Sequence, residues 1–123
     1  MDTALWIAQI VLALIFATAG LLKLRQPRDK LVASMGWVDD FSGGFVKFVG
    51  GVELLGALGL ILPAVTDISP ILVPIAATGL ALAQIAAAIV HVRRKEPRFI
   101  IGNLVLVAIA VFIAWGRFGD YPL

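Results

Sequence analysis

The 123-residue sequence lacks cysteine, has a single histidine, and is poor in charge, with Asp, Glu, Lys and Arg making up 15 % of the chain. Without cysteine the protein has no disulfides, no thiolate metal site and no dithiol redox chemistry of its own. A single histidine excludes a metal site built from several histidines. Disordered chains have few apolar residues, which is not the case here, and a net charge of +2 is too small for a nucleic-acid-binding chain.

Apolar residues are abundant instead. They make up 61 % of the chain, and the mean hydropathy is +1.02. A soluble domain of this size buries the smallest share of its surface, so it could not hide this much apolar surface from water. The composition therefore indicates a small integral membrane protein, with the lipid bilayer as its first partner and no nucleic acid partner.

Four apolar stretches are long enough to cross a bilayer, which takes about 20 residues of helix for a core about 30 Å thick. They cover residues 4–22, 45–62, 71–90 and 99–115. A soluble helical bundle would show a polar face along each helix, and these stretches are apolar nearly all round. We predict an all-α fold, an integral membrane four-helix bundle that forms a single domain over residues 1–123.

Basic residues are distributed unevenly between the two sides of this bundle. All of the Lys and Arg residues except Arg117 fall in or beside the loops 23–47 and 91–98. By the positive-inside rule both loops face the cytoplasm and both termini lie outside, in the inner (plasma) membrane. Contact with anionic lipid headgroups would also account for these basic residues without any substrate.

The first of these loops contains the pattern of a short helix that begins after Pro27. Leu31, Met35 and Trp37 would face the acyl boundary while the charged residues face water, which is an interfacial arrangement. A short interfacial helix is therefore part of the predicted fold.

Glu53 is the most informative residue within the apolar stretches. It lies about 12 Å into the second span at about 1.5 Å of rise per residue. Its neighbours on the same helix face are Gly50, Gly56 and Ala57, and small residues mark helix contacts in membranes. We therefore expect Glu53 to project into the bundle, where a carboxylate is costly unless paired and marks a functional site by default. The alternative is a structural carboxyl group that hydrogen-bonds between helices.

Other polar residues are expected close to Glu53. Gln84 and His91 are seven residues apart and share one face of the third span, and Gln84 lies at a depth where it can hydrogen-bond to Glu53. His91 is either a solvated boundary residue or, because histidine titrates near neutrality, a proton relay. Glu53 and His91 are the catalytic candidates. The predicted ligand-binding set is Lys23, Glu53, Gln84 and Asn103.

The remaining polar and aromatic residues of the spans have a structural interpretation. Trp6, Trp37 and Trp115 are typical of belt residues at the two membrane interfaces. Gln9 is expected to hydrogen-bond between helices, and no metal site is predicted.

Several stretches, taken in order, resemble the DoxX-like family of small four-span bacterial membrane proteins. They are AGLLKL at the end of the first span, GGVELLGALGLILP in the second, AAIVHVRRKEP at the end of the third, and NL early in the fourth. The resemblance covers residues 4–115 and implies a four-helix membrane protein. Matched position by position, it gives Lys23, Glu53 and His91 as candidate site residues, without an established role for any of them.

The resemblance also implies an association with membrane redox assemblies, because the family takes its name from a small subunit of a thiosulfate:quinone oxidoreductase. The absence of cysteine separates this chain from four-helix quinone-reducing enzymes that use cysteine pairs. Electrons would therefore have to come from a partner or from a bound cofactor. The sequence encodes no cofactor site of its own, and a quinone is the cofactor that the resemblance suggests.

Three functions remain open at this point. The first is a subunit or accessory component of a quinone-linked membrane redox assembly, with a protein partner or a homo-oligomer. The second is a binding protein or enzyme for a lipophilic molecule such as a quinone, an isoprenoid or an epoxide, with Glu53 as acid or base. The third is passage of protons or solutes, which four short spans with one acid and no inverted repeat do not favour. Whether the protein is an enzyme is left open.

Overall fold

The structure is a computed structural model that describes the backbone of residues 1–123 and every side chain except those of Arg28 and Ser34. Its elements are α1 (Asp2–Arg25), α2 (Arg28–Ser34), the 3₁₀ helix η1 (Gly36–Asp40), α3 (Gly43–Thr66), α4 (Leu72–Arg93) and α5 (Pro97–Phe118). Four of the helices are long and apolar enough to cross a membrane. The predicted all-helical bundle is therefore confirmed.

Three of the long helices extend beyond the predicted apolar stretches at both ends, and α4 extends beyond its stretch at the C-terminal end. Ser42 begins α3, because its Oγ accepts a hydrogen bond of 3.1 Å from the Phe45 amide and so caps a helix N-terminus. At the other end α3 continues through Pro63 to Thr66. The predicted stretch 45–62 stops at the glycines before Phe45 and at Pro63, which are typical of helix ends but lie inside α3.

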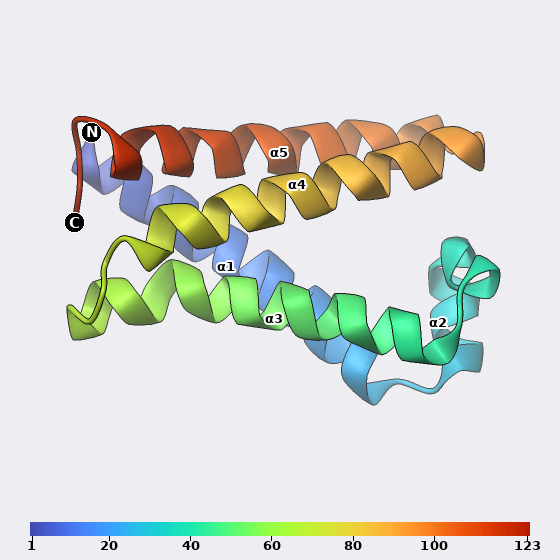
Figure 1. The fold of residues 1–123 in the computed structure, drawn as a ribbon. Helices are drawn as coiled ribbons and strands as arrows, with labels where there is room; N and C mark the ends of the chain where they lie inside the picture. Colours follow the sequence, from blue (N-terminus) through green and yellow to red (C-terminus); the bar gives the residue numbers. More distant parts are fainter.

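The four long helices form two antiparallel pairs, α1 with α3 and α4 with α5. Figure 1 shows the two pairs meeting at the end that carries the chain termini and separating toward α2. We call the first of these the Arg117 end and the second, which carries α2, η1 and the α4–α5 turn, the Lys23 end.

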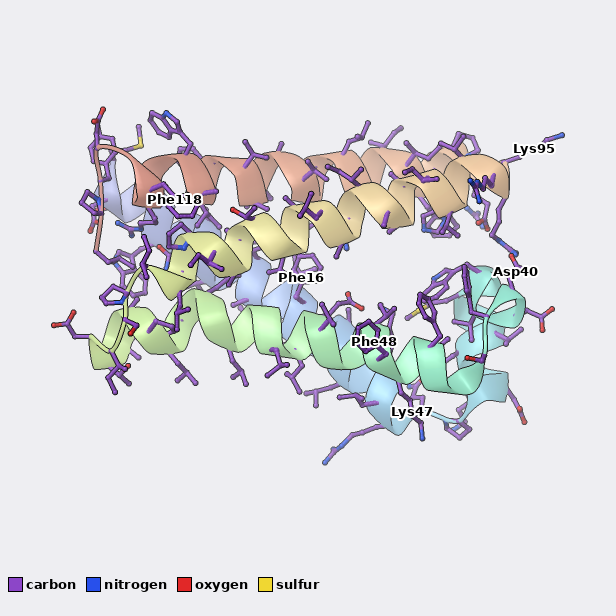
Figure 2. All side chains as sticks on the ribbon, viewed as in Figure 1. Phe16, Asp40, Lys47, Phe48, Lys95 and Phe118 are labelled. Carbon is purple, nitrogen blue, oxygen red and sulfur yellow. The ribbon has the colours of Figure 1, made fainter. Side chains whose placement is uncertain are left out.

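The main hydrophobic core lies in the middle of the bundle and toward the Arg117 end. Phe16, which Figure 2 labels between the two pairs, is 1 % exposed and belongs to this core. All four long helices contribute side chains, which are Leu12, Ala13, Phe16, Ala57, Leu60, Val73, Ala77, Leu80, Ala81, Ala110 and Ile113. Toward the Lys23 end this core gives way to polar residues.

The short helix of the first loop exists, but its apolar face is not turned to lipid. Leu31 and Val38 are 3 % and 0 % exposed and form a small cluster with Val46 of α3. Met35 and Trp37 are partly buried and pack against that cluster. The prediction that Leu31 faces the acyl boundary is therefore wrong, because η1 folds this segment back onto the start of α3, and Met35 and Trp37 are turned only partly away from the protein surface.

Candidate functional site

The site begins with a close crossing of α1 and α3 at two glycines. A Cβ atom on Gly20 would lie 2.7 Å from the Gly50 carbonyl oxygen, and one on Gly50 would lie 2.7 Å from the Cβ of Lys23. Neither position has room for a larger residue without movement of the backbone. The sequence thus brings the two helices to their closest approach one turn from Lys23 and Glu53.

Lys23 and Glu53 converge at this crossing. In an antiparallel pair, each side chain leans toward the N-terminus of its own helix, so the two lean toward each other. Lys23 Nζ lies 2.6 Å from Glu53 Oε1, and the residues are 7 % and 4 % exposed. The expectation that Glu53 projects into the bundle is confirmed, and its charge is compensated by an ion pair that the sequence reading did not foresee.

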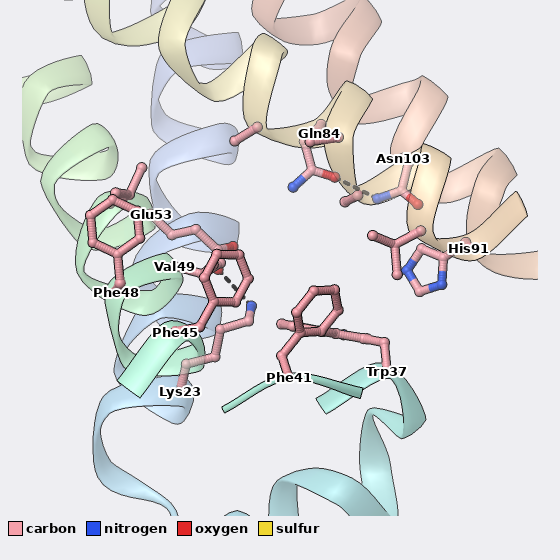
Figure 3. Close-up of a pocket in the computed structure, with 15 residues that line it drawn as sticks. Lys23, Trp37, Phe41, Phe45, Phe48, Val49, Glu53, Gln84, His91 and Asn103 are labelled. Carbon is pink, nitrogen blue, oxygen red and sulfur yellow. Dashed lines mark hydrogen bonds and ion pairs between the residues drawn. The ribbon is translucent and has the colours of Figure 1, made fainter. Parts of the chain in front are cut away.

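A second polar pair lies on the opposite wall, between α4 and α5. Asn103 Nδ2 donates to Gln84 Oε1 at 2.6 Å. The expected hydrogen bond between Glu53 and Gln84 is not formed among the described side chains, because each has its partner within its own helix pair. Figure 3 shows the two pairs facing each other across an open space.

That space is a pocket of ≈ 290 Å³, which we call the Lys23 pocket. Apart from five polar residues the lining of the pocket is apolar. Every long helix and η1 contribute residues to it. The lining residues are Lys23, Trp37, Phe41, Phe45, Phe48, Val49, Val52, Glu53, Ala83, Gln84, Ala86, Ala87, Val90, His91 and Asn103. All five of the predicted site residues are among them.

An aromatic wall, made of Trp37, Phe41, Phe45 and Phe48, forms the side of the pocket nearest η1 and α3. Neighbouring ring centroids are separated by 5.8, 5.0 and 6.5 Å in that order. Lys23 Nζ lies 5.8 Å from the centre of the Trp37 ring. This wall was not predicted from the sequence: only Phe45 and Phe48 share a face of α3, and Phe41 reaches the wall from the extended residue after η1.

A chain of charged side chains, which we call the clasp, begins at His91 of the pocket lining. His91 Nδ1 donates to Glu96 Oε1 at 3.2 Å, and Arg94 Nε donates to the same oxygen at 3.0 Å. Arg94 Nη1 also pairs with Asp40 of η1. The clasp therefore joins η1, which carries Trp37, to the α4–α5 turn; Figure 2 shows Asp40 beside the turn that carries Lys95.

The clasp sets the ionisation of its central carboxyl group. The hydrogen bonds from His91 and from Arg94 hold the pKa of Glu96 below its ordinary value of 4.5. Glu96 is therefore an anion throughout the neutral range, and His91 is fixed at the pocket wall by a partner outside the pocket.

A different network closes the Arg117 end. Gln9 Nε2 donates to the Leu60 carbonyl at 2.8 Å, while Gln9 Oε1 accepts from Arg117 Nε at 2.8 Å. Arg117 Nη1 donates to Asp2 at 2.6 Å and to the Tyr121 carbonyl at 3.1 Å. Arg117 is only 2 % exposed. The prediction that Gln9 bonds between helices is confirmed, and this network ties together α1, α3 and α5.

The prediction that the tryptophans are belt residues at the membrane interfaces does not suit all three of them equally. Trp115 is 54 % exposed, as a belt residue would be, whereas Trp37 lines the pocket. Trp6 stacks on Arg117, with 5.8 Å between the guanidinium carbon and the ring centre. Among the described side chains no group of three or more His, Asp and Glu residues could hold a metal ion.

Comparison with known proteins supports the resemblance noted above. Residues 7–113 match the model of a family described as the DoxX-like family. No curated protein and no solved structure matches the chain.

Proposed function

This chain belongs to the DoxX-like family, and from that premise we propose that it binds a lipophilic small molecule in the Lys23 pocket. The observation that carries this proposal is the pocket itself. A space of ≈ 290 Å³ lies between two helix pairs, with a mostly apolar lining and two polar pairs on facing walls. Apolar pockets with a few convergent polar groups are typical of small-molecule sites.

The polar pairs would orient the molecule, and Glu53 with Lys23 could also act on it. Lys23 can donate a hydrogen bond and Glu53 can accept one. The polar head of a bound molecule would therefore find a donor and an acceptor side by side. The same two groups can give and take a proton, and His91 would relay protons between them and the cytoplasm. Binding is the primary function that we propose, with Glu53 and His91 as the candidates for any chemistry.

The pocket is expected to lie in the cytoplasmic half of the inner membrane. The loops rich in Lys and Arg lie at the Lys23 end, and the positive-inside rule would place that end in the cytoplasm. Six of their basic residues are exposed, as contact with anionic lipid headgroups would require. These six are Arg25, Lys30, Lys47, Arg93, Lys95 and Arg98.

The test is native mass spectrometry of the protein extracted gently from its host membrane. The unaltered chain and the control Lys47→Met, an exposed lysine outside the pocket, should retain one small molecule per chain. Lys23→Met and Phe48→Ala should lose it. Phe48 is 66 % exposed, so its truncation removes part of the pocket wall at little cost to folding. An unaltered chain without a bound molecule, or equal retention in all variants, would overturn the proposal.

A second candidate is a subunit of a quinone-linked membrane redox assembly, as the family resemblance suggests. It is favoured by outward-facing glycines on α4 and α5. Gly79 and Gly102 are exposed, and a Cβ on either would meet no atom within 4 Å. Small residues at a lipid-facing surface allow another helix to approach closely. In the same experiment an additional protein mass would support a partner, a multiple of the chain mass would support a homo-oligomer, and a lone monomer would count against both.

A further inference from the structure

We infer that the molecule held in the Lys23 pocket is a single-chain lipid whose uncharged head accepts hydrogen bonds, as a carbonyl group does. This inference rests on the proposed function, since it names the ligand class of the same site. Three features of the pocket carry it: hydrogen-bond donors on both of its polar walls, the balance of charge in its lining, and the route by which a tail can leave.

The first donor is the side-chain amide of Gln84 on α4. Gln84 is 8 % exposed, and its Oε1 atom is engaged because it accepts from Asn103 Nδ2 at 2.6 Å. The other end of the amide, Nε2, faces the open space (Figure 3), and it has no acceptor among the described residues. In an apolar setting a donor without an acceptor is destabilising, so Nε2 calls for an acceptor supplied by a bound molecule.

The second donor faces the first from the opposite wall. The Lys23 ammonium group carries three N–H groups, and its one ion-pair partner among the described side chains is Glu53, with 2.6 Å between Nζ and Oε1. A bound acceptor can therefore use a remaining N–H group and leave Glu53 in place. A carbonyl oxygen has two lone pairs, so a carbonyl head suits a pocket that presents donors from two sides.

The balance of charge excludes a charged head. Lys23 and Glu53 already compensate each other, and the facing pair, Gln84 and Asn103, consists of two neutral amides. An anionic head would compete with Glu53 for Lys23, and a cationic head would compete with Lys23 for Glu53. Either would leave a buried charge without its partner, which is costly. An uncharged head can accept from Lys23 and Gln84 and leave the ion pair intact.

The size and position of the pocket place the tail outside it. At ≈ 290 Å³ the pocket lies at the lower limit for small-ligand sites, about 300–1,000 Å³, so it has room for a head rather than for a whole lipid. Phe48 of α3 is 66 % exposed and Val52 is 37 % exposed, and Ala86 of α4 is exposed as well. These lining residues also form the bundle surface, so a tail can pass between α3 and α4 into the surrounding acyl chains.

The experiment compares four probes that share an undecyl tail. They are methyl undecyl ketone, its methylidene analogue (in which CH₂ replaces the carbonyl oxygen), undecanesulfonate and undecylamine. Each probe displaces tritium-labelled methyl undecyl ketone from the purified full chain in dodecyl maltoside micelles, at equal mole fractions in the micelle. The ketone should bind about tenfold more tightly than the methylidene analogue, which has the same shape and lacks the acceptor, because one added hydrogen bond has about this value. It should also bind more tightly than the sulfonate or the amine.

Variants of α4 assign the effect to Gln84. Gln84→Met keeps the length of the side chain and removes the amide donor, so the preference for the ketone over its methylidene analogue should disappear. The control Ile85→Met changes the next residue, which is 45 % exposed and outside the pocket lining, and should keep the preference. The comparison of probes on the unaltered chain needs no pocket variant, so the inference remains testable even if Gln84→Met folds poorly.

The outcomes separate this inference from the proposed function. If the methylidene analogue binds as tightly as the ketone, if the sulfonate or the amine binds best, or if Gln84→Met keeps the preference, the ligand class is wrong while a binding pocket remains. The same holds if the ketone does not bind but the extracted chain retains a small molecule. If the ketone does not bind and no small molecule is retained on extraction, the proposed function fails as well.

Discussion

Each end of the bundle contains a buried cation, but the two cations connect different numbers of helices. At the Arg117 end, one buried cation and Gln9 bond across three helices. At the Lys23 end, one buried cation bonds only within the α1–α3 pair, and the amide bond stays within the α4–α5 pair. Among the described side chains, the clasp from Arg94 to Asp40 is what joins the two pairs there.

This difference shows how a chain of this size can hold a cavity. Buried polar groups stabilise a membrane bundle when they bond between helices that must stay together. Where each bond stays within one pair, the pairs are free to separate, and the space between them becomes a pocket. The Arg117 end thus acts as the fixed base and the Lys23 end as the open side.

The largest effect is expected from removing the central cation of the fixed base. Arg117→Ala leaves Gln9 Oε1 and Asp2 without a donor and empties a buried volume, so the free energy of unfolding should fall by about 2–4 kcal/mol. Unfolding in mixed detergent micelles measures it. Arg93→Ala, a change at an exposed residue, is the control; an equal loss in both variants would show that the Arg117 network is not what holds this end together.

The helix crossing beside the pocket offers a matched pair of neighbouring glycines. Gly50→Ala forces a Cβ against Lys23, whereas Gly51→Ala meets no atom within 4 Å. Overpacking at Gly50 should cost about 1–3 kcal/mol and weaken retention of the bound molecule, while Gly51→Ala should stay within about 0.5 kcal/mol of the unaltered chain. Similar stabilities for the two variants would argue against a close crossing at Gly50.

The Lys23–Glu53 ion pair of the open end, unlike the Arg117 network, should be replaceable by two apolar residues. Lys23→Met or Glu53→Leu alone strands a buried charge, and each should lower the free energy of unfolding by about 1–2 kcal/mol. The double variant strands none and should recover most of the loss. A double-mutant cycle in mixed micelles measures the coupling. Additive losses would mean that the two residues do not interact in the membrane.

The smallest effect is expected at the clasp, and it depends on pH. Because the pKa of Glu96 is lowered by His91 and Arg94, its contribution is fully present above the ordinary value of 4.5 and is lost as the pH falls through the lowered pKa. Trp37 fluorescence, in a chain with Trp6→Phe and Trp115→Phe, should show a transition as the pH falls below 4.5.

The same signal tests the clasp by substitution. Arg94→Gln breaks the link to Asp40 and should produce the acid form of the Trp37 signal at neutral pH. Lys95→Gln, one residue further along the same turn, should not. An acid transition that is the same with and without Arg94 would show that the clasp does not position η1.

The sequence was sufficient to predict the four helices, because each needs only a long apolar run. It also predicted the five polar residues of the site, since polar side chains within such runs are rare and must face the interior. It could not predict which of them pair. The Lys23–Glu53 ion pair depends on the Gly20–Gly50 crossing, which sets the register of two helices and is a tertiary property.

The burial of the first loop against α3 also could not be predicted from a local sequence pattern. The apolar face of an amphipathic segment can be buried against lipid or against protein, and the sequence pattern is the same in both cases. Leu31 and Val38 are buried against Val46 rather than in lipid, because the loop is short enough to fold back onto α3. That fold brings Trp37 into the pocket lining, where the belt interpretation had not placed it.

The most direct test of the account is a pair of distance measurements by electron paramagnetic resonance. Because the chain lacks cysteine, spin labels can be placed at Lys47→Cys and Val92→Cys at the Lys23 end, and at Leu62→Cys and Ile75→Cys at the Arg117 end. All four positions are exposed, and each pair spans α3 and α4. Arg94→Gln, which breaks the clasp, should shift the distance distribution at the Lys23 end and leave that at the Arg117 end unchanged. Two unchanged distributions, or an equal shift at both ends, would contradict a fixed base with an open side.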